Sequence, residues 1–279
     1  MKPLRILITG ASSGLGLHAL LRLIKSGHSV IAGVRGGDAR LAEILAKEGV
    51  AGSTWAVDLH LDKAETFGLA ARAVDRHFGG HLDVLINNAG YGLFGAIEDQ
   101  SLAQIRRQFE VNTFGPVGLT QALLPQLRAA RGRIINVSSA ADFWTMPLYG
   151  TYCASKAALA SMSEAMYYDL RPEGLQVGLL EPGGFRTNFI GTAKVLADGS
   201  RSRERVEALN RFFAKVESRL VHPDRIAQKL VSLCERRRLP LRNLVGSDAW
   251  LAGFMARMLP WPLRVRLQEW LYRKFVFKE

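Results

Sequence analysis

The chain has 279 residues, of which 48% are hydrophobic and 22% charged, a composition typical of a globular protein that forms its core without disulfides or metals. It has no uninterrupted run of about 18 apolar residues, and its N-terminal apolar run is too short for a signal peptide, so we expect neither a membrane-spanning helix nor a leader. The net charge of +12 raises the question of an acidic partner. The two cysteines lie far apart in sequence and lack the spacing of metal ligands, so we expect a cytoplasmic protein with no bound metal.

Short apolar segments alternate with segments of helical length over the first 190 residues. The expected strands are Leu4–Thr9, Ser29–Val34, Ser53–Val57, Leu82–Ile86, Arg133–Val137 and Leu175–Leu180. The expected helices include Leu15–Ser26, Asp62–Phe78, Leu102–Ala130 and Tyr152–Leu170. Strands that are apolar throughout are buried on both faces, as in a parallel sheet. The alternation therefore predicts an α/β fold, a doubly wound parallel sheet of the Rossmann type with helices on both faces.

The last third of the chain has a weaker pattern. Residues 191–220 are polar and basic, and a helix is expected over His222–Arg236, followed by a short strand at Asn243–Val245. The remaining residues look helical on either side of Pro260 and Pro262. Because no linker or repeat interrupts the chain, we expect one cofactor-binding and catalytic domain over residues 1–246 and a basic helical extension over residues 247–279.

The glycine-rich segment TGASSGLG, from Thr9 to Gly16, lies between the first expected strand and the first expected helix. Glycines in this position allow a tight turn and let a pyrophosphate approach the N-terminus of the helix. A plain turn between strand and helix is the alternative. The place of the loop in the first of several strand–helix units favours a dinucleotide site.

Five further motifs follow in order along the chain. They are NNAG at Asn87–Gly90, Asn112 within EVNTFG, Ser139 at the end of NVSS, Tyr152 and Lys156 within YCASK, and PGGFRT from Pro182 to Thr187. Together with the glycine loop, they make about residues 3–190 resemble the short-chain dehydrogenases/reductases, especially the single-domain branch with its 17β-hydroxysteroid, retinol and carbonyl reductase members. The resemblance implies an NAD(P)-dependent oxidoreductase that acts on CH–OH or C=O groups.

Tyr152 and Lys156 are four residues apart and therefore face the same side of one helix. The pKa of free tyrosine is about 10, and a neighbouring positive charge favours the phenolate. We therefore expect Lys156, together with the charge of the nicotinamide, to lower the pKa of Tyr152 and make it a general acid/base. Ser139 would hold the substrate oxygen, and the family's spacing favours it over Ser138. The resemblance adds that Lys156 binds the nicotinamide ribose and that Asn112 supports a water-mediated proton path.

The second expected strand ends at Val34 and Arg35, where NAD-specific folds place an acidic residue. Arg35, assisted by Ser12, would instead bind a 2′-phosphate, so we expect NADP(H) to be preferred over NAD(H). A solvated arginine is the alternative interpretation.

The resemblance also implies the remaining cofactor contacts. They are Gly10, Ser12, Ser13, Gly14, Leu15 and Gly16 in the glycine loop, Asp58 and Leu59 after the third strand, Asn87, Ala89 and Gly90 in NNAG, and Pro182, Gly183 and Thr187 beside the nicotinamide. Asn87 could be only a turn former, and Thr187 could also cap a following helix.

Aromatic side chains lie close in sequence to the expected catalytic residues. Phe143 and Tyr149 lie between the serine and the tyrosine, Phe94 follows NNAG, and Phe185 follows the proline–glycine pair. With Ser139, they are expected to contact a lipophilic ketone, aldehyde or alcohol, since no nearby charge cluster suits a phosphate or carboxylate. Some of them are expected to belong to the core or to a dimer contact instead. The resemblance places a substrate-covering lid at residues 188–215.

The excess positive charge lies in the last third of the chain. Residues 1–190 have 18 Lys and Arg against 16 Asp and Glu, whereas residues 191–279 have 19 against 9. Residues 261–278 combine an apolar stripe (Leu263, Leu267, Trp270, Leu271, Phe275) with basic residues (Arg264, Arg266, Arg273, Lys274, Lys278). Such a helix either packs on the protein, which we favour, or lies peripherally on an anionic membrane. No recognition motif accompanies the charge, so no nucleic-acid partner is expected.

Two other functions are compatible with the fold. An epimerase or dehydratase of the extended branch would need a larger substrate domain, and a nucleotide-sensing regulator typically loses the tyrosine or the lysine. Relatives commonly assemble through the helices that carry Asn112 and Tyr152, so a homo-oligomer is expected.

Overall fold

A sheet of seven parallel strands forms the centre of the computed structural model, which describes residues 2–50, 52–184, 194–199, 201–216 and 221–277. Its strands are β1 (Arg5–Thr9), β2 (Ser29–Val34), β3 (Thr54–Asp58), β4 (Val84–Asn87), β6 (Arg133–Val137), β7 (Gln176–Pro182) and β9 (Arg242–Val245). They lie in the order β3-β2-β1-β4-β6-β7-β9. The order reverses between β1 and β4, and ligands bind at such a switch point in open α/β sheets.

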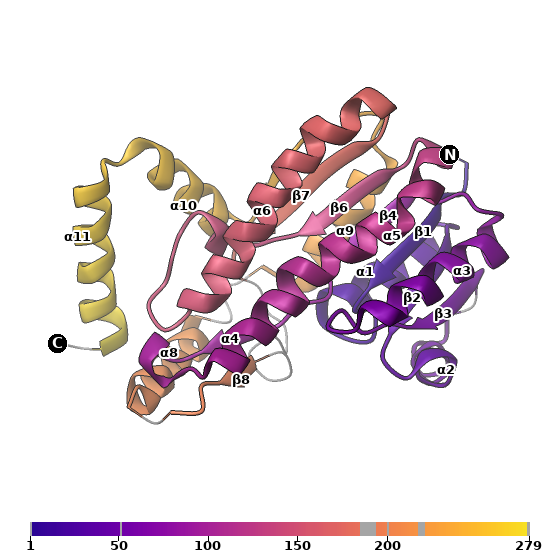
Figure 1. The fold of residues 1–279 in the computed structure, drawn as a ribbon. Coiled ribbons are helices and arrows are strands. Elements are labelled where there is room, and N and C mark those ends of the chain that lie inside the picture. The colour runs from indigo at the N-terminus through magenta and orange to yellow at the C-terminus, as the bar shows by residue number, and fades with distance from the viewer. Residues whose placement is uncertain (1, 51, 185–193, 200, 217–220, 278–279) are drawn as a thin grey trace.

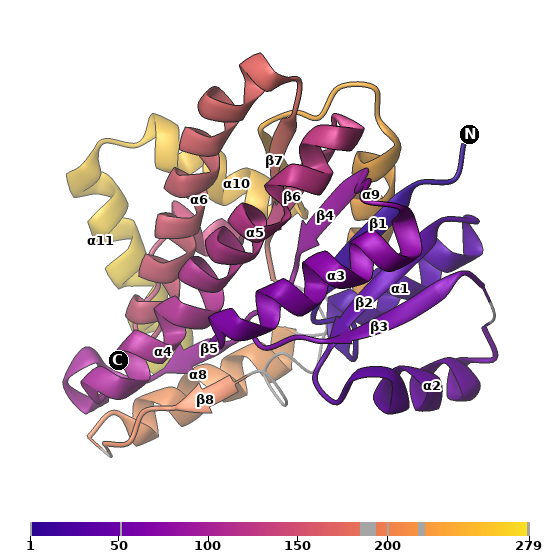
Figure 2. The same ribbon diagram turned by 45° about the vertical axis from the view of Figure 1, so that its right-hand side comes forward.

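Helices cover both faces of the sheet (Figure 1, Figure 2). The main ones are α1 (Gly14–Lys25), α2 (Gly37–Glu48), α3 (Phe67–Phe78), α5 (Gly115–Ala130), α6 (Gly150–Leu170) and α9 (Pro223–Glu235). Successive strand residues point to opposite faces, so Ile6 and Ile8 pack in the core with α1 and α9, and Leu7 packs in the core with α3 and α5. Both faces are therefore apolar, which explains the continuous hydrophobicity of the strands.

The expected α/β fold is confirmed, and the six strands expected in the first 190 residues lie within two residues of their expected ends. One expected helix, Leu102–Ala130, is divided into α4 (Leu102–Phe109), a π-helical turn at Glu110–Phe114, and α5. The sequence pattern did not indicate α2. Short 3₁₀ turns occur at Ala64–Thr66, Ile97–Asp99, Ala140–Asp142 and Arg171–Glu173.

A second, two-stranded sheet lies beyond the carboxyl ends of the main strands and was not expected. It pairs β5 (Gly92–Phe94) with β8 (Lys194–Leu196), and α8 (Arg203–Val216) follows. The described parts of the segment expected as a lid, residues 188–215, are therefore β8, the turn after it and most of α8.

The C-terminal extension is helical on either side of Pro260, as expected. It consists of α10 (Ser247–Met258), α11 (Trp261–Leu271) and a π-helical turn at Tyr272–Phe277. Pro262 lies in the first turn of α11, where a missing N–H costs no hydrogen bond. The two helices form a hairpin at the side of the molecule (Figure 1). No helix among the described residues is long and apolar enough to cross a membrane.

Candidate active site

The glycine loop is locked to the end of β4 by hydrogen bonds. Thr9 Oγ1 accepts from the backbone N–H groups of Asn88 at 3.0 Å and Ala89 at 2.9 Å, and Asn88 Nδ2 donates to Thr9 O at 2.9 Å. A Cβ atom on Gly16 would lie 2.1 Å from Gly10 O and 2.5 Å from Asn88 Nδ2, so only glycine fits there. Asn88, which the motif analysis did not single out, fixes the loop at the switch point.

The N-terminus of α1 is open to a ligand. Ser13 at the N-cap is exposed and its side chain caps no backbone N–H, and a Cβ atom on Gly14 would meet nothing within 4 Å. The unpaired N–H groups of a helix start attract an anion, so this end of α1 fits a pyrophosphate. The side chain of Leu15 is buried in the core, which leaves only its backbone to contact a cofactor.

The residues after β2 leave a guanidinium exposed. Arg35 follows the buried Val34, and its side chain has no ion pair with any residue in the described part of the chain. Asp58 accepts a hydrogen bond from Gly36 N at 2.9 Å and thereby fixes the turn that carries Arg35. Leu59 is buried, and a Cβ atom on Gly33 would lie 2.9 Å from its Cδ2, so the side chain of Leu59 supports the loop from inside the core.

The NNAG segment divides into a structural part and a part that faces the catalytic residues. Asn87 is buried, and its Nδ2 donates to Asn136 Oδ1 at 2.7 Å and to Thr120 Oγ1 at 3.1 Å. Its side chain therefore braces β4 against β6 and α5, and the expected contact of Asn87 with the cofactor stays a prediction. A Cβ atom on Gly90 would lie 3.1 Å from Asn112 Oδ1 and 3.5 Å from Lys156 Nζ.

The π-helical turn between α4 and α5 places Asn112 in the interior. Its Oδ1 accepts from Tyr91 N at 3.1 Å, and its Nδ2 donates to Tyr91 O at 2.9 Å and to Ser155 Oγ at 3.2 Å. A π-helical turn holds one residue more than an α-helical turn, and such turns occur frequently at functional sites. The two contacts with Tyr91 reach the loop after β4, and the contact with Ser155 reaches α6. Asn112 therefore holds together the two elements that border Lys156.

Tyr152 and Lys156 lie on successive turns at the start of α6, and both are buried. Lys156 Nζ donates to Val137 O at the end of β6 at 2.8 Å and lies 6.0 Å from the centroid of the Tyr152 ring. Burial lowers the pKa of Lys156 to about 8, and the carboxyl of Asp142 opposes this shift. The lysine therefore needs the carbonyl and a nearby negative charge to remain protonated.

The pKa of Tyr152 is governed mainly by its burial. Burial raises this pKa, because a phenolate would lose its hydration, and a side-chain hydrogen bond with Ser139 lowers it in part. The ammonium of Lys156 is directed to Val137 O. The lowering expected from Lys156 together with the nicotinamide stays a prediction.

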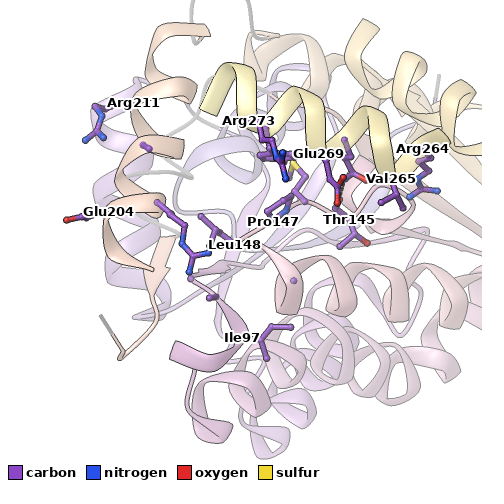
Figure 3. A pocket seen from close by; sticks show the side chains of 18 of the residues that line it. Ile97, Thr145, Pro147, Leu148, Glu204, Arg211, Arg264, Val265, Glu269 and Arg273 are labelled. Atoms are coloured by element: carbon purple, nitrogen blue, oxygen red, sulfur yellow. Dashed lines mark hydrogen bonds between the residues drawn. The ribbon is translucent and has the colours of Figure 1, made fainter. Parts of the chain in front are cut away.

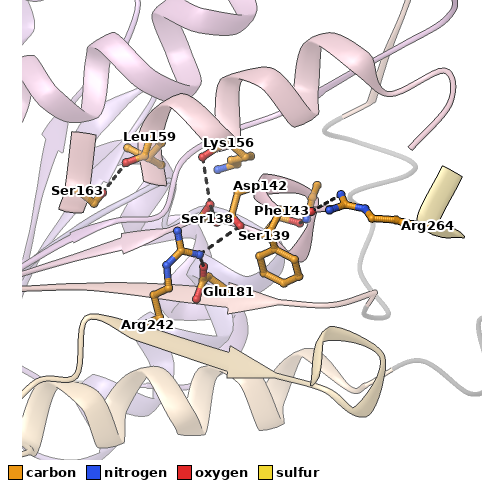
Figure 4. A network of polar contacts seen from close by, with 11 residues as sticks. Ser138, Ser139, Asp142, Phe143, Lys156, Leu159, Ser163, Glu181, Arg242 and Arg264 are labelled. Carbon is orange, nitrogen blue, oxygen red and sulfur yellow. Dashed lines mark hydrogen bonds and ion pairs between the residues drawn. The ribbon is translucent and has the colours of Figure 1, made fainter. Parts of the chain in front are cut away.

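The two adjacent serines have different partners (Figure 4). Ser139 Oγ accepts from Ala141 N at 3.2 Å and shares a hydrogen bond with Tyr152. Ser138 Oγ donates to Asp142 Oδ2 at 2.7 Å and so closes the turn that carries Ser139. The contact with Tyr152 agrees with the choice of Ser139 as the residue that faces the substrate oxygen.

A buried ionic cluster lies beneath this turn and was missed in the sequence. The side chains of Asp142 and Glu181 are fully buried, and Arg242 Nη1 lies 2.6 Å from Glu181 Oε1 and 3.7 Å from Asp142 Oδ1 (Figure 4). Burial raises the pKa of both carboxyl groups. The only signal in the sequence is an acidic residue, Glu181, at the end of the apolar run of β7.

The loop after β7 is fixed from the other side by the C-terminal extension. Gly183 N donates to Val245 O at 2.9 Å, and Gly184 N donates to Asp248 Oδ2 at 2.6 Å. A Cβ atom on Gly183 would lie 2.3 Å from the Asp248 carboxylate, so the chain must be glycine there. Pro182 ends β7 and is buried. Phe185 and Thr187, expected to contact substrate and cofactor, lie outside the described residues.

Three aromatic residues expected to contact the substrate are placed differently. Phe94 is fully buried, and its ring centroid lies 3.8 Å from that of Tyr149, which is also buried and packs edge-on against Tyr152. Phe94 and Tyr149 are therefore core residues that support Tyr152, because aromatic rings of this size gain most from full burial. Phe143 packs towards Gly253 of α10 and lines a small cavity there.

A larger cavity of about 960 Å³ lies between the segment 145–150, α8 and α11 (Figure 3). Its apolar lining includes Met146, Leu148 and Tyr272, which also belong to the hydrophobic cluster around Tyr152. The arginines that line it are Arg205, Arg211, Arg264 and Arg273. Helices α8 and α11 bring these arginines together from distant parts of the sequence.

In the described part of the chain, no group of three or more His, Cys, Asp or Glu side chains has an arrangement that could hold a metal ion.

Proteins similar to this chain fall into one family. The family model described as short chain dehydrogenase matches residues 5–195. The chain is 34% identical over 263 residues to the probable short-chain type dehydrogenase/reductase VdlC of Helicobacter pylori, which covers 91% of this chain and 92% of that protein. It is 31% identical over 280 residues to the 3-ketodihydrosphingosine reductase of Bacteroides thetaiotaomicron, which covers 95% of this chain and 98% of that protein.

The same family appears among solved structures. A short-chain dehydrogenase from Streptomyces avermitilis matches with a TM-score of 0.79 and 30% sequence identity, over 98% of this chain and 97% of that chain. Its fold is that of the sheet and helices described above. The chain belongs to the short-chain dehydrogenase/reductase family and is an NAD(P)-dependent oxidoreductase.

Proposed function

We propose that the protein interconverts a lipophilic ketone or aldehyde and the corresponding alcohol with NADP(H), and that Tyr152 is its general acid/base. The observation that carries the proposal is the buried phenol of Tyr152, hydrogen-bonded to Ser139 and one helical turn from Lys156. A bound nicotinamide supplies or accepts the hydride. The residues of the chain then need only to hold the substrate oxygen and move one proton.

In the direction of reduction, Tyr152 donates its proton to the carbonyl oxygen as that oxygen gains negative charge. Ser139 donates a second hydrogen bond to the same oxygen and orients the carbonyl. The raised pKa of Tyr152 keeps the phenol protonated before the reaction. Lys156 and Asn112 lie beside Gly90, where they can hold a ribose hydroxyl and pass a proton to the phenolate that remains.

NADP(H) is proposed over NAD(H) because of Arg35. An exposed guanidinium without an ion pair in the described part of the chain, at the end of β2, offers a planar partner for a 2′-phosphate. Ser12, in the glycine loop, is half-buried and adds a hydroxyl donor.

A lipophilic substrate is proposed from the apolar part of the large cavity and its contact with the cluster around Tyr152. The name of the Bacteroides relative, a 3-ketodihydrosphingosine reductase, supports a ketone of lipid character. The turn after β8 and helix α8 border this cavity, in the segment proposed to cover the substrate.

A homo-oligomer in the cytoplasm is proposed as the working form. Phe114 at the start of α5 and Met162 on α6 are exposed apolar side chains on the helices that carry Asn112 and Tyr152. Apolar side chains on neighbouring helices fit burial by a second copy.

A screen of ketones, aldehydes and alcohols with NADPH absorbance as the readout tests the function, with Tyr152→Phe as the decisive variant. The variant retains the ring and its packing but cannot exchange a proton. We expect cofactor binding to remain within about twofold and kcat to fall by about 10²-fold or more. Full activity in the variant would refute the mechanism, and cofactor binding without turnover of any substrate by the wild type would favour a nucleotide-sensing regulator.

A further inference from the structure

Large apolar side chains are concentrated on the outer surface of α10 and α11. These helices and the first residues after them, 247–274, are called the C-terminal arm. Of the fifteen exposed large hydrophobic side chains among the described residues, seven lie on the arm, and each is more than half exposed. They are Trp250, Leu251, Phe254, Met258, Trp261, Leu263 and Trp270. Three of the five tryptophans of the chain are in this set.

The arrangement of side chains on α10 is the reverse of that on an ordinary surface helix. The side that packs on the body buries the small residues Ala249 and Gly253, and the opposite side carries Trp250, Phe254 and Met258, spaced four residues apart. A helix of a globular protein usually packs its large apolar side chains inward. An outward apolar row on a helix that already has a packed side indicates a second surface to be covered.

On α11 the outer side combines apolar and basic residues. Leu263, Arg266 and Trp270 are exposed and lie three to four residues apart on one side of the helix, and exposed Arg273 continues the row. Lys274 Nζ lies 4.8 Å from the centroid of the Trp270 ring. The arm has five basic residues (Arg257, Arg264, Arg266, Arg273, Lys274) and two acidic residues, Asp248 and Glu269.

This combination of groups favours one kind of partner. A second copy that met the arm through the same surface would bring two sets of like charges together, which disfavours a symmetric dimer. A lipid surface with anionic headgroups attracts the basic residues and accepts the tryptophans at the headgroup level. We propose that the C-terminal arm docks the protein peripherally on an anionic lipid surface.

The docked arm would connect the lipid surface to the active site. Arg264 Nη2 donates to Phe143 O at 2.6 Å, Gln268 donates to Thr145 O, and Asp248 accepts from Gly184 N at 2.6 Å. The inner side of α11 lines the large cavity (Figure 3), and the exposed side chains of Trp261 and Arg273 are also part of its lining. About 10 Å, the thickness of one helix, then separates the lipid-facing side from the cavity. This link to the cavity rests on the proposed function, whereas the docking itself does not.

Co-sedimentation of the full chain with vesicles tests the docking. We expect binding to vesicles of phosphatidylcholine with phosphatidylglycerol, little binding to phosphatidylcholine alone, and loss of binding as salt is raised. The apolar variant is Phe254→Ser with Trp270→Ser, matched by Leu69→Ser, which removes an exposed leucine from α3. The basic variant is Arg266→Gln with Lys274→Gln, matched by Lys25→Gln with Lys47→Gln on α1 and α2.

Each arm variant is expected to lower vesicle affinity by about tenfold or more, and each matched control by less than about twofold. None of the altered side chains lines the large cavity, so thermal unfolding and turnover of a water-soluble substrate without lipid should stay unchanged. Equal binding of the arm variants and the wild type, or no binding to anionic vesicles, would overturn the proposal. So would a dimer that the arm variants dissociate. If vesicles bind but no ketone or alcohol is turned over, the docking stands and the proposed function fails.

Discussion

Arg242 Nη1 lies 2.6 Å from Glu181 Oε1 and 3.7 Å from Asp142 Oδ1, and so connects two buried carboxyl groups that are 39 residues apart in sequence. One guanidinium can balance only one carboxylate, and burial raises the pKa of both carboxyl groups. Asp142 closes the serine turn through Ser138, and Glu181 precedes the loop beside the nicotinamide site. Arg242 therefore links the two loops that border Tyr152.

Replacing Glu181 by Gln tests the raised pKa of this buried carboxyl group. The folded pKa of Glu181 is raised above its ordinary value of 4.5, so the unfolded chain loses this proton first as pH increases. Wild-type stability should therefore be fully present below pH 4.5 and fall as pH rises above it. In Glu181→Gln the side chain does not titrate, so this decline should be absent.

Urea denaturation of both proteins between about pH 5 and pH 8 measures the difference in slope. The exposed Glu48→Gln on α2 is the matched control and should follow the wild type. Parallel pH profiles for Glu181→Gln and the wild type would show that the pKa of Glu181 is not raised by folding.

Replacing Arg35 by Gln tests the choice of cofactor. The variant removes a guanidinium that is exposed at the end of β2. Within the described part of the chain, this guanidinium has no ion pair. We expect kcat/KM for NADPH to fall about tenfold or more and that for NADH to change by less than about twofold, since only NADPH has a 2′-phosphate. Arg40→Gln, which removes a neighbouring arginine paired with Glu43, is the control. A wild type that uses NADH as efficiently as NADPH would refute the assignment.

Replacing Asp248 by Ala tests the clamp on the loop after β7. The substitution removes the acceptor of the Gly184 N–H, and the backbone beside the nicotinamide site loses its support from α10. We expect cofactor Kd to rise about fivefold with a smaller loss of stability, on the order of 1 kcal/mol, because the carboxylate is exposed. Asp248→Asn, which retains one acceptor oxygen, should recover most of the affinity. Equal cofactor titrations for Asp248→Ala and the wild type would exclude the clamp.

Replacing Asn136 by Ala tests the brace beneath the NNAG segment. Asn136 Oδ1 accepts from Asn87 at 2.7 Å, and its Nδ2 donates to Ser163 Oγ at 2.7 Å, all in the interior. The variant would leave buried polar groups without these partners, at a cost of about 2–4 kcal/mol in the free energy of unfolding. Chemical denaturation measures this loss. Steady-state enzyme kinetics of the folded variant, measured in parallel, separates it from any effect on catalysis. A loss below about 1 kcal/mol would mean that the brace contributes little.

The sequence predicted the catalytic arrangement wherever a short stretch of chain sets the geometry. The spacing of Tyr152 and Lys156 places them on successive turns of one helix, and glycines at fixed positions of Thr9–Gly16 allow the close approach to Asn88. The strands of the main sheet could be located because burial on both faces makes them apolar throughout. The π-helical turn around Asn112 was not predictable, since the side chains of α4 and α5 have an uninterrupted helical pattern across it.

The aromatic residues show where closeness in sequence misleads. Phe94 and Tyr149 were expected to face the substrate because they are near the catalytic motifs in sequence. In the structure they pack on each other behind Tyr152, since the two-stranded sheet and the segment 145–150 turn them inward. The direction of a loop side chain depends on what packs against the loop, and local spacing does not contain that information.

The sequence alone thus determined the parallel sheet, the glycine loop and the Tyr152–Lys156 pair, because periodicity and backbone sterics act within a few residues. Tertiary structure decided the burial of Tyr152, the buried cluster of Asp142, Glu181 and Arg242, and the outward face of the C-terminal arm. Each of these depends on burial and on partners that the strand order brings together across the molecule. Removal from water sets the pKa of a side chain and determines which apolar surfaces remain to be covered.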